Sequence, residues 1–468
     1  MRYFLFTIAM LASLAASAVT VSSTPGALAS LVTDKSITEL IVTGKIDARD
    51  IAFIADELND LTVLNLSSAQ IEAFSGTVPS LGDAESYPAG EIPARAFAGK
   101  GYSRVTLPSS IISIGDAAFA GCRSLATVNL PAKLQSIGND AFNNSGVTAA
   151  TIPVSVTNMG KRVFANCRRL THAYVNCAEL GIEAFAGCHN LMKLSIAKAL
   201  RSIGDGAFKG TGRVQITIPE GSLLATIGDN AFRNSQLDEF NFEALTNLKS
   251  IGAWAFANTS LTSVSIPHGV IAVGDGAFFY NTELTSVALP RSLSVVSNFV
   301  LAGDNAVVGD SILMKGHNTV GDYAFYNWDQ TEKFVVSSSV NNIGERAFAG
   351  MTALNSLYAY PRQVPQLGAN VWEGVDQAHA TLRVHGSVVD NYSVADQWMD
   401  FGGIFAYKNV TLDLNNDGGV DVADVVALAN FTMGDVPQVF DIESADVNGD
   451  GNVDISDVVF LSNIIMGS

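Results

Sequence analysis

Two segments near the C-terminus carry oxygen-bearing side chains at matching positions. They run from Asp413 to Asp424 and from Asp446 to Asp457, and equivalent residues are 33 positions apart throughout. Side-chain oxygens at positions 1, 3, 5, 9 and 12, with the carbonyl of position 7, can surround a hard cation. The sequence therefore predicts two Ca²⁺ sites. The expected ligands are Asp413, Asn415, Asp417, Gly419, Asp421 and Asp424, and Asp446, Asn448, Asp450, Asn452, Asp454 and Asp457.

Two further features separate these segments from ordinary acidic loops. Gly418 and Gly451 occupy position 6, where a sharp turn folds the ligands inward. A solvated acidic loop is the alternative, but it would not reproduce this spacing twice. From Asn409 to Ser468 the chain holds ten Asp, one Glu and no Lys or Arg, a local charge of −11. Calcium is therefore expected to act chiefly on the folding of this segment.

Each loop is followed by a pattern typical of a helix. The expected helices cover Val422–Thr432 and Ile455–Ile465, whereas 407–412 before the first loop is extended in character. Their predicted apolar stripes consist of Val425, Val426 and Leu428, and of Val458, Val459, Leu461 and Ile465. Position 12 is Asp, not the longer Glu of an ordinary EF-hand. Duplicated loop–helix units of this kind resemble a dockerin domain.

The dockerin resemblance implies a protein partner, a cohesin module of a scaffold or surface protein. In that family the partner is often recognised by positions 10 and 11 of each loop. These positions hold Val422 and Ala423 in the first loop and Ile455 and Ser456 in the second. A Ser-Thr pair is common at these positions in one well-known type. This chain departs from that pair, so the resemblance gives no cohesin specificity for it.

The long segment before these loops repeats itself. A unit of the form Leu-x-x-Val-x-Leu/Ile-Pro, then Ile-Gly-x-x-Ala-Phe, recurs between residues 92 and 360, and its Phe recurs every 21 to 26 residues. A regular period in this range predicts a solenoid. The repeated Phe residues are Phe97, Phe119, Phe142, Phe164, Phe185, Phe208, Phe232, Phe256, Phe278, Phe299, Phe325 and Phe348. The copy at Phe299 lacks both the usual Gly and the usual Ala, which predicts a distortion between Val295 and Tyr323.

One unit shows how the repeat should fold. Val128 and Leu130 lie on one side of a short strand that Pro131 ends. Ile137 and Phe142 are expected to point into the core. Because one coil cannot bury its Phe alone, the core must be built by stacking coil on coil.

The repeated unit resembles the BspA-like leucine-rich repeats of bacterial surface antigens. The resemblance rests on Ile114–Cys122, Ile203–Phe208 and Ile343–Gly350. It implies an α/β solenoid: a leucine-rich repeat stack of short parallel strands, with about 12 coils plus caps. A small calcium-binding α domain of two loop–helix, or half EF-hand, units follows it. The family looks like adhesins, and it carries no catalytic residues to transfer.

The expected organisation has five parts. A signal peptide covers 1–18, because an apolar run after Arg2 ends in the small-x-small pattern Ala16-Ser17-Ala18. Capping coils cover 19–91, with a short helix over Ile51–Leu58. The repeats cover 92–360, a C-terminal cap 361–407 and the dockerin-like domain 408–468. In that cap Trp372 and Trp398 are interpreted as packing residues, with sugar platforms as the alternative.

Composition limits the possible functions. The 468 residues include 45 acidic and 27 basic side chains, so the formal charge is −18, which excludes an electropositive nucleic-acid binder. No later stretch is long enough to span a membrane. Cys122, Cys167 and Cys188 each lie three residues after a repeated Phe. Free buried thiols are the preferred interpretation, and a disulfide between Cys167 and Cys188 is left open.

No catalytic motif stands out. The six His form no zinc signature, and neither a Gly-x-Ser-x-Gly turn nor a phosphate-binding Gly-rich loop is present. The favoured hypothesis is a secreted or cell-surface, non-catalytic adhesion protein. Its solenoid would bind a host, matrix or other cell-surface protein, and its C-terminal domain would dock to a cohesin-type partner. The alternatives are an accessory component of an extracellular polysaccharide-degrading complex, and a hidden glycan-acting enzyme, which the absent motifs disfavour.

Overall fold

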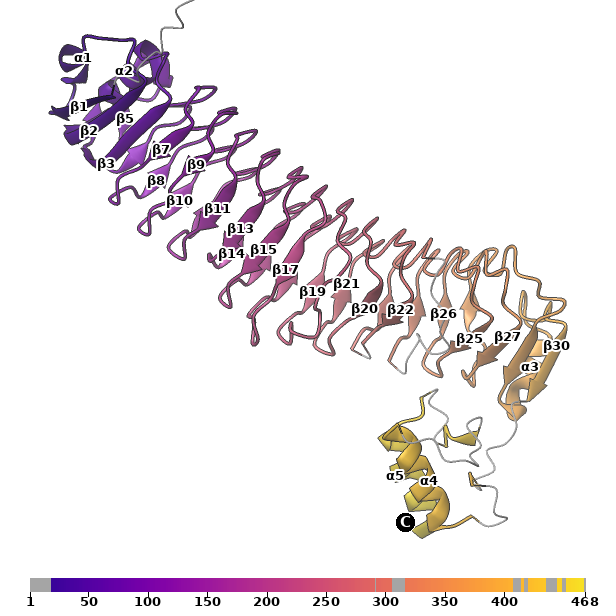
Figure 1. The fold of residues 1–468 in the computed structure, drawn as a ribbon. Coiled ribbons are helices and arrows are strands. Elements are labelled where there is room, and N and C mark those ends of the chain that lie inside the picture. Colours follow the sequence, from indigo (N-terminus) through magenta and orange to yellow (C-terminus); the bar gives the residue numbers. More distant parts are fainter. Residues whose placement is uncertain are drawn as a thin grey trace, which may run out of the picture. The chain divides into compact units, whose positions relative to one another are not determined.

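The structure is a computed structural model that describes residues 18–290, 292–304, 316–406, 414–415, 420–434, 444–447 and 452–466. The predicted signal peptide, apart from Ala18, lies outside these residues. The chain divides into two compact units, Met1–Ala173 and Tyr174–Ser468. Figure 1 shows short strands following one another coil by coil within each unit.

The first unit begins with longer strands and two helices. Strands β1 (Ala18–Ser23), β2 (Glu39–Ile46) and β3 (Val63–Ile71) pair in parallel, and helices α1 (Leu28–Leu31) and α2 (Ala48–Glu57) connect them. The helix predicted over Ile51–Leu58 is therefore present and begins earlier. Its start is set by Asp47, which caps the helix, and by Asp50, whose carboxylate accepts from the Asp47 backbone N–H. Short elements β4 (Phe74–Ser75), β5 (Ser86–Tyr87) and η1 (Pro79–Leu81) follow.

Each coil of the first unit contributes to two parallel ladders. One ladder continues from β3 into β7 (Arg104–Thr106) and β9 (Thr127–Val128). The second consists of β6 (Glu91–Ile92), β8 (Ser113–Ile114), β10 (Ser136–Ile137) and β12 (Asn158–Met159). The sequence predicted only the first of these strands in each coil. The second strand is two residues long, too short for its period to be read from sequence.

The second unit repeats the two-ladder arrangement. The ladder equivalent to the second ladder of the first unit consists of two sheets. The first sheet holds β14 (Glu179–Leu180), β16 (Ser202–Ile203), β18 (Thr226–Ile227), β19 (Ser250–Ile251) and β21 (Ala272–Val273). The second holds β23 (Val295–Val296), β24 (Thr319–Val320), β26 (Asn342–Ile343) and β28 (Gln366–Leu367). The other ladder has β15 (Lys193–Ile196) with β17 (Gln215–Thr217), β20 (Ser263–Ser265) with β22 (Ser286–Ala288), and β25 (Lys333–Val336), β27 (Ser356–Ala359), β29 (Thr381–Val384) and β30 (Gly403–Ala406).

The remaining elements are two strands, β11 (Ala149–Ile152) and β13 (His172–Val175), and the helices that follow the ladders. Strand β11 belongs to the first unit, and β13 contains the boundary between the units. Near the end of the solenoid are η2 (Gly386–Val388) and α3 (Val389–Ser393). The C-terminal segment contains α4 (Val422–Thr432) and α5 (Ile455–Met466). No helix in the described residues is long and apolar enough to cross a membrane.

Stacked aromatic rings run through the core of each unit, and in the second unit they are interrupted between Phe278 and Phe325. In the first unit Phe142 is fully buried, and its ring centroid lies 5.1 Å from those of Phe119 and Phe164, nearly parallel to both. In the second unit the last ring of the column is Trp372, 5.0 Å from Phe348. Trp398 is also buried. Both Trp residues therefore pack in the core and are not exposed platforms, and the coil pattern continues past residue 360.

At Phe299 the structure corrects the choice of core residue, while residues 305–315 of the region predicted to be distorted lie outside the described residues. The β23 pairing aligns Val296 with Val320, five residues before Phe325. The residue in the repeated Phe position is therefore Leu301, which is fully buried and whose N–H bonds the Ala324 carbonyl. Phe299 lies two residues earlier, at a positive φ of 53°, and stacks on Tyr323. The sequence assignment failed because it matched residue type, whereas the ladder register decides position.

The position three residues after most of the repeated Phe residues is buried, and two cysteines at this position bond to the preceding coil. The Cys122 thiol donates to the Phe97 carbonyl and the Cys167 thiol to the Phe142 carbonyl, at 3.0 and 3.1 Å. None of the four cysteines forms a disulfide in this structure, so the one left open between Cys167 and Cys188 is not formed. Burial raises the pKa of the Cys122 and Cys167 thiols to about 11, which keeps both protonated and unreactive at neutral pH.

Candidate metal centre

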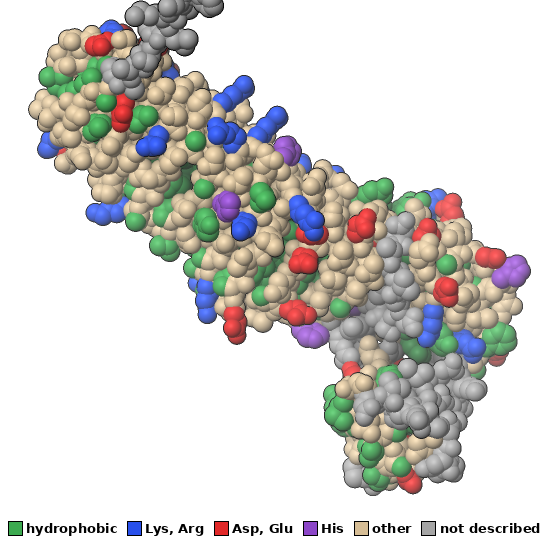
Figure 2. All heavy atoms as spheres, in the orientation of Figure 1, with side chains coloured by type: hydrophobic (Ala, Val, Ile, Leu, Met, Phe, Trp, Pro, Cys, Tyr) green, Lys and Arg blue, Asp and Glu red, His purple; other side chains and the backbone are tan. Residues whose placement is uncertain are grey.

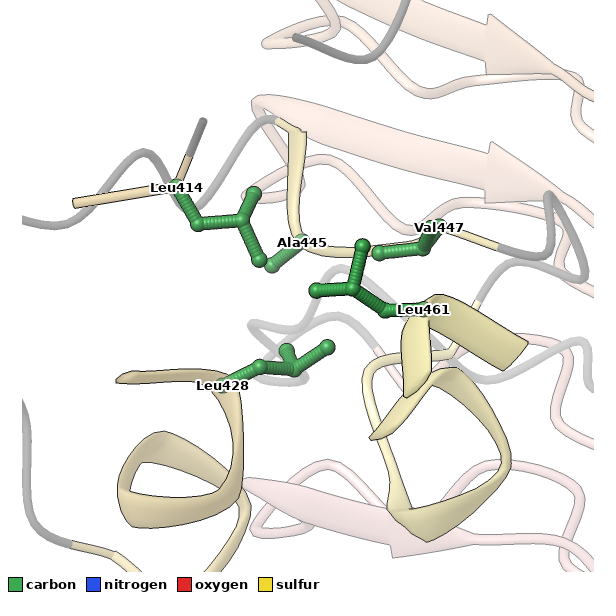
Figure 3. Packing of buried hydrophobic residues seen from close by; sticks show 5 residues of the cluster. All are labelled: Leu414, Leu428, Ala445, Val447 and Leu461. Carbon is green, nitrogen blue, oxygen red and sulfur yellow. The ribbon is translucent and has the colours of Figure 1, made fainter. Parts of the chain in front are cut away.

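The two C-terminal helices share a small apolar core. Helix α4 contacts α5, and a buried cluster lies between their segments (Figure 3). Its members are Leu414, Leu428, Ala445, Val447 and Leu461, with Val425, Val453, Val458 and Ile465 packed against it. Leu414 and Val447 are 33 residues apart, as are Leu428 and Leu461. The sequence duplication therefore reappears as a pseudo-symmetric core.

The first loop ends in a capping box. The Asp421 carboxylate accepts from the Ala423 N–H at 2.7 Å, while Asp424 Oδ2 accepts from the Asp421 N–H at 2.9 Å. These bonds satisfy backbone donors that every helix start leaves unpaired. Positions 9 and 12 of the predicted loop therefore also begin helix α4.

The second loop repeats this geometry. Asp454 Oδ1 accepts from the Ser456 N–H at 2.7 Å, and Asp457 Oδ2 accepts from the Asp454 N–H at 2.8 Å. The Ser456 hydroxyl adds a bond to the same Asp454 oxygen at 2.6 Å. Helix α5 thus begins with the same two acids, 33 residues after those of α4.

Asp424 also ties the start of its loop to the helix. Its Oδ1 accepts from the backbone N–H groups of Leu414, at 2.7 Å, and Asn415, at 3.1 Å. Positions 2, 3 and 12 of the loop are therefore held together, and the Asp424 carboxylate is fully buried, as is that of Asp457. Burying a carboxylate is costly unless it is hydrogen-bonded, paired or bound to a metal. Since no Lys or Arg follows Lys408, the donor set fits a hard divalent cation.

The described residues include part of each predicted ligand set. Asn415, Asp421 and Asp424 are described in the first loop, and Asp446, Asn452, Asp454 and Asp457 in the second. Asp413, Asp417, Gly419, Asn448 and Asp450 lie outside the described residues. Within the residues that are described, no three His, Cys, Asp or Glu side chains gather as a metal-binding group. The complete ligand sets therefore stay a prediction.

Beside the two caps lies a duplicated set of exposed apolar side chains. Val422 and Val426 are 64% and 52% exposed on α4, and their equivalents Ile455 and Val459 are 68% and 54% exposed on α5. Ala423 is exposed and Ser456 partly buried. The sequence assigned Val426 and Val459 to the buried stripes, which is wrong. The helical spacing of four from Val422 to Val426 and from Ile455 to Val459 was the available signal.

Comparison with known families finds both parts of the chain. The family model described as BspA type leucine rich repeat region matches residues 90–212, 178–307 and 318–393. The model described as dockerin type I domain matches residues 411–466. Among curated proteins, no sequence matches.

Solved structures of bacterial leucine-rich repeat proteins are similar in fold. One from Bacteroides ovatus is 22% identical, covers 69% of this chain and 88% of its own, and has a TM-score of 0.55. The pneumococcal vaccine antigen PcpA is 15% identical, with 69% and 86% covered and a TM-score of 0.39. A protein from Eubacterium ventriosum is 19% identical, with 71% and 88% covered and a TM-score of 0.36.

Proposed function

Since this chain belongs to the BspA-type leucine-rich repeat family and ends in a dockerin type I domain, we propose that it is a secreted or cell-surface protein that binds other proteins without catalysis. Its C-terminal domain docks in the presence of calcium onto a cohesin-type module. Its solenoid presents a second surface for adhesion to a host, matrix or cell-surface protein.

The duplicated exposed face of α4 and α5 is the observation that carries the docking proposal. Four aliphatic side chains are exposed to solvent, while other apolar residues of the same helices pack in the small core. The exposed four are Val422, Val426, Ile455 and Val459. Exposed apolar residues grouped on one element mark interaction sites. The partner contacts inferred from sequence, positions 10 and 11 of each loop, lie at the N-terminal end of these faces.

Calcium supports this face through the helix starts. Asp421 with Asp424, and Asp454 with Asp457, begin the two helices and belong to the predicted ligand sets. Bound calcium offsets the repulsion among acids in a segment that lacks cations. The cation therefore stabilises the helices that carry the docking residues.

The solenoid offers outward-facing strand residues that are mostly small and polar. In β20 Ser263 and Ser265 are exposed while Val264 between them is buried, and in β17 Gln215 and Thr217 are exposed. Such a ladder suits an extended protein partner held by many weak contacts.

The docking proposal is tested by binding of the full chain to a panel of cohesin modules, with calcium and with a chelator. Capture should occur with calcium and disappear with the chelator. Because each helix presents an equivalent face, the decisive variant is the pair Val422→Asp and Ile455→Asp, which should weaken binding at least ten-fold.

A matched control is Val154→Asp, which places the same charge at an exposed aliphatic position of the solenoid. It should bind like the unchanged chain. Equal binding by the paired variant, or capture that persists in the chelator, would contradict the proposed docking surface.

A further inference from the structure

A cavity of about 550 Å³ in the first unit has an unusual lining for so acidic a chain. Three guanidinium groups and three side-chain amides contribute to it: Arg123, Arg168, Arg169, Asn143, Asn144 and Asn166. These residues come from the turns that follow Phe119, Phe142 and Phe164 in three successive coils. The cavity is therefore separate from the strand ladders and from the C-terminal helices considered above.

The cavity originates in a turn that is one residue short. The buried aliphatic residue that ends each turn lies six positions after the Phe in two coils, Leu125 after Phe119 and Leu170 after Phe164. In the middle coil Val147 lies only five positions after Phe142. Where the neighbouring coils place Arg123-Ser124 and Arg168-Arg169, the middle coil has only Gly146. A notch results, with arginines from the longer turns on either side.

Gly146 lets the short turn pack closely against the preceding coil. Its N–H donates to the Cys122 carbonyl at 3.0 Å, and a Cβ at this position would overlap the Arg123 carbonyl oxygen. The preceding residue, Ser145, is buried and bonded to the Cys167 thiol at 3.3 Å. The floor of the notch is therefore fixed by contacts to both neighbouring coils, and the cavity is built into the repeat.

Two of the arginines that line the cavity have no acidic partner among the described residues. Within the residues described, neither Arg123 nor Arg169 forms an ion pair, and both side chains are exposed. The acid on the same short coil, Asp140, pairs with Arg162 at 2.7 Å and accepts from the Asn143 amide at 2.6 Å. Like charges that line one cavity are unfavourable together, and a bound anion removes that cost.

The lining also selects the kind of anion. A guanidinium presents a planar fork of donors that matches a carboxylate or sulfate. Side-chain amides both donate and accept, as sugar hydroxyls require. Protein partners are usually anchored by buried aromatic or aliphatic groups, and no such side chain lines this cavity. Its volume lies within the range of small-ligand sites, roughly 300–1,000 Å³.

We propose that this notch binds an acidic sugar, a carboxylate- or sulfate-bearing residue of a glycan. The arginines bind the anionic group, and the amides of Asn144 and Asn166 bind neighbouring hydroxyls. The site is separate from the calcium-dependent docking face and from the strand surface proposed to bind a protein, so it gives the solenoid a second ligand.

The experiment is calorimetric titration of the full chain, kept in calcium, with four probes. These are oligogalacturonate, chondroitin sulfate, a neutral galacto-oligosaccharide of equal length and a poly-glutamate peptide. One or both of the acidic glycans should bind, with an affinity that falls as salt rises. Which one binds distinguishes a carboxylate from a sulfate ligand.

Two variants locate the site. Arg123→Gln with Arg169→Gln should weaken binding at least ten-fold, and Asn166→Asp should weaken it by placing a carboxylate in the cavity at a backbone position, φ 59°, that Asp also tolerates. The matched control is Arg104→Gln, an exposed arginine on β7 outside the cavity. Unchanged melting temperatures verify that all variants fold.

Several results would overturn the proposal. They are no binding of either acidic glycan, equal affinity for the neutral oligosaccharide, equal or tighter binding of poly-glutamate, and the same loss in Arg104→Gln as in the paired variant. The last result would mean that diffuse surface charge, not this cavity, attracts the ligand.

Discussion

Helices α2 and α4 begin in almost the same way, although they lie in different units. In both, the residue that caps the helix is an Asp, and the third residue of the helix is a buried Asp that completes a capping box. Asp50 reaches back to the N–H groups of Gly26 and Leu28, as Asp424 does to those of Leu414 and Asn415. The one difference is charge: Arg49 pairs with Asp47 at 2.6 Å, whereas no Lys or Arg exists in the segment around α4.

This difference teaches what a cation must do at the C-terminus. Backbone donors suffice to bury a single carboxylate, as Asp50 shows. Backbone donors do not offset the mutual repulsion of ten Asp within about 60 residues at the C-terminus. At α2, by contrast, the guanidinium of Arg49 offsets the charge of Asp47. We therefore expect calcium to act at α4 and α5 as Arg49 acts at α2. In Figure 2 charged side chains elsewhere on the visible surface stand singly or in small groups among neutral ones.

The largest expected effect is the loss of α4 and α5 on calcium removal. Adding a chelator to the full chain should abolish hydrogen-exchange protection in both helices, while α2 and the Phe-stacked coils keep theirs. Each predicted calcium site should contribute about 2.7 kcal/mol at a hundredfold excess over its dissociation constant, a large share of what so small a core supplies. Mass spectrometry of the exchanged peptides measures the loss of protection in α4 and α5.

The paired variant Asp417→Ala and Asp450→Ala should lose the same protection even with calcium present. Asp400→Ala, an exposed acid of the solenoid, is the control and should change nothing. Persistent protection of α4 and α5 in the chelator would break the analogy between calcium and Arg49.

The next effect concerns the solenoid, which depends on stacked rings and not on a cation. Phe142→Ala removes a fully buried ring that contacts two others, and should lower the free energy of unfolding by about 3–5 kcal/mol. Urea unfolding followed by circular dichroism measures this loss, which should be equal with and without calcium. Val154→Ala, at an exposed position, serves as control; a cost for Phe142→Ala below that of the control would refute the stacked-core account.

A third prediction uses a buried carboxylate that has too few donors. Asp304 accepts one N–H, from Asn281, and its Oδ2 has no partner among the described residues. Burial raises the pKa of Asp304 well above its usual value. Asp304→Asn keeps the bond to Asn281 and should stabilise the protein at pH 7 by about 1–3 kcal/mol.

The pH dependence of this effect has a definite sign. An acid whose pKa is raised by folding costs stability as pH rises from its unfolded value near 4 through the folded pKa. The gain from Asp304→Asn should therefore be greatest at pH 7 and shrink towards pH 4. Urea unfolding across this range tests it, and an unchanged or lowered stability at pH 7 would show that Asp304 is better solvated than its contacts indicate.

The smallest effect concerns a surface pair. Arg162 lowers the pKa of Asp140 by hydrogen bonding, and both side chains are partly exposed. Arg162→Ala should cost less than about 1 kcal/mol at pH 7. Because the Asp140 pKa is depressed, this contribution is present above its unfolded value near 4 and is lost as pH falls through the folded pKa. Melting curves at pH 7 and pH 2 measure the stability difference between Arg162→Ala and the unchanged chain. A difference that persists at pH 2 would contradict this assignment.

Sequence reasoning succeeded where residue type and local spacing decide the outcome. The Phe period predicted the ring column, and the 33-residue offset predicted α4 and α5 with nearly the observed bounds. It failed at Phe299, because Leu301 fills the core position once the β23 register is set. It also misplaced Val426 and Val459, since both helices carry more apolar residues than their small shared core can bury.

The arginine cavity needed coordinates for another reason. The missing turn residue at Gly146 is visible in sequence, but Arg123 and Arg169 are 46 positions apart and belong to different coils. Only the stacking of three coils brings their side chains to one notch. A search for short turns with arginines in the corresponding turns of both neighbouring coils was the available signal.

The sequence by itself determined that the chain stacks repeats and ends in two loop–helix units, because periodic burial and ligand spacing are properties of the local chain. The tertiary structure decided which residue of each repeat is buried, which apolar side chains stay in water and where cations from distant coils converge. Those outcomes depend on ladder register and on the space left between coils, and neither is encoded at a single position.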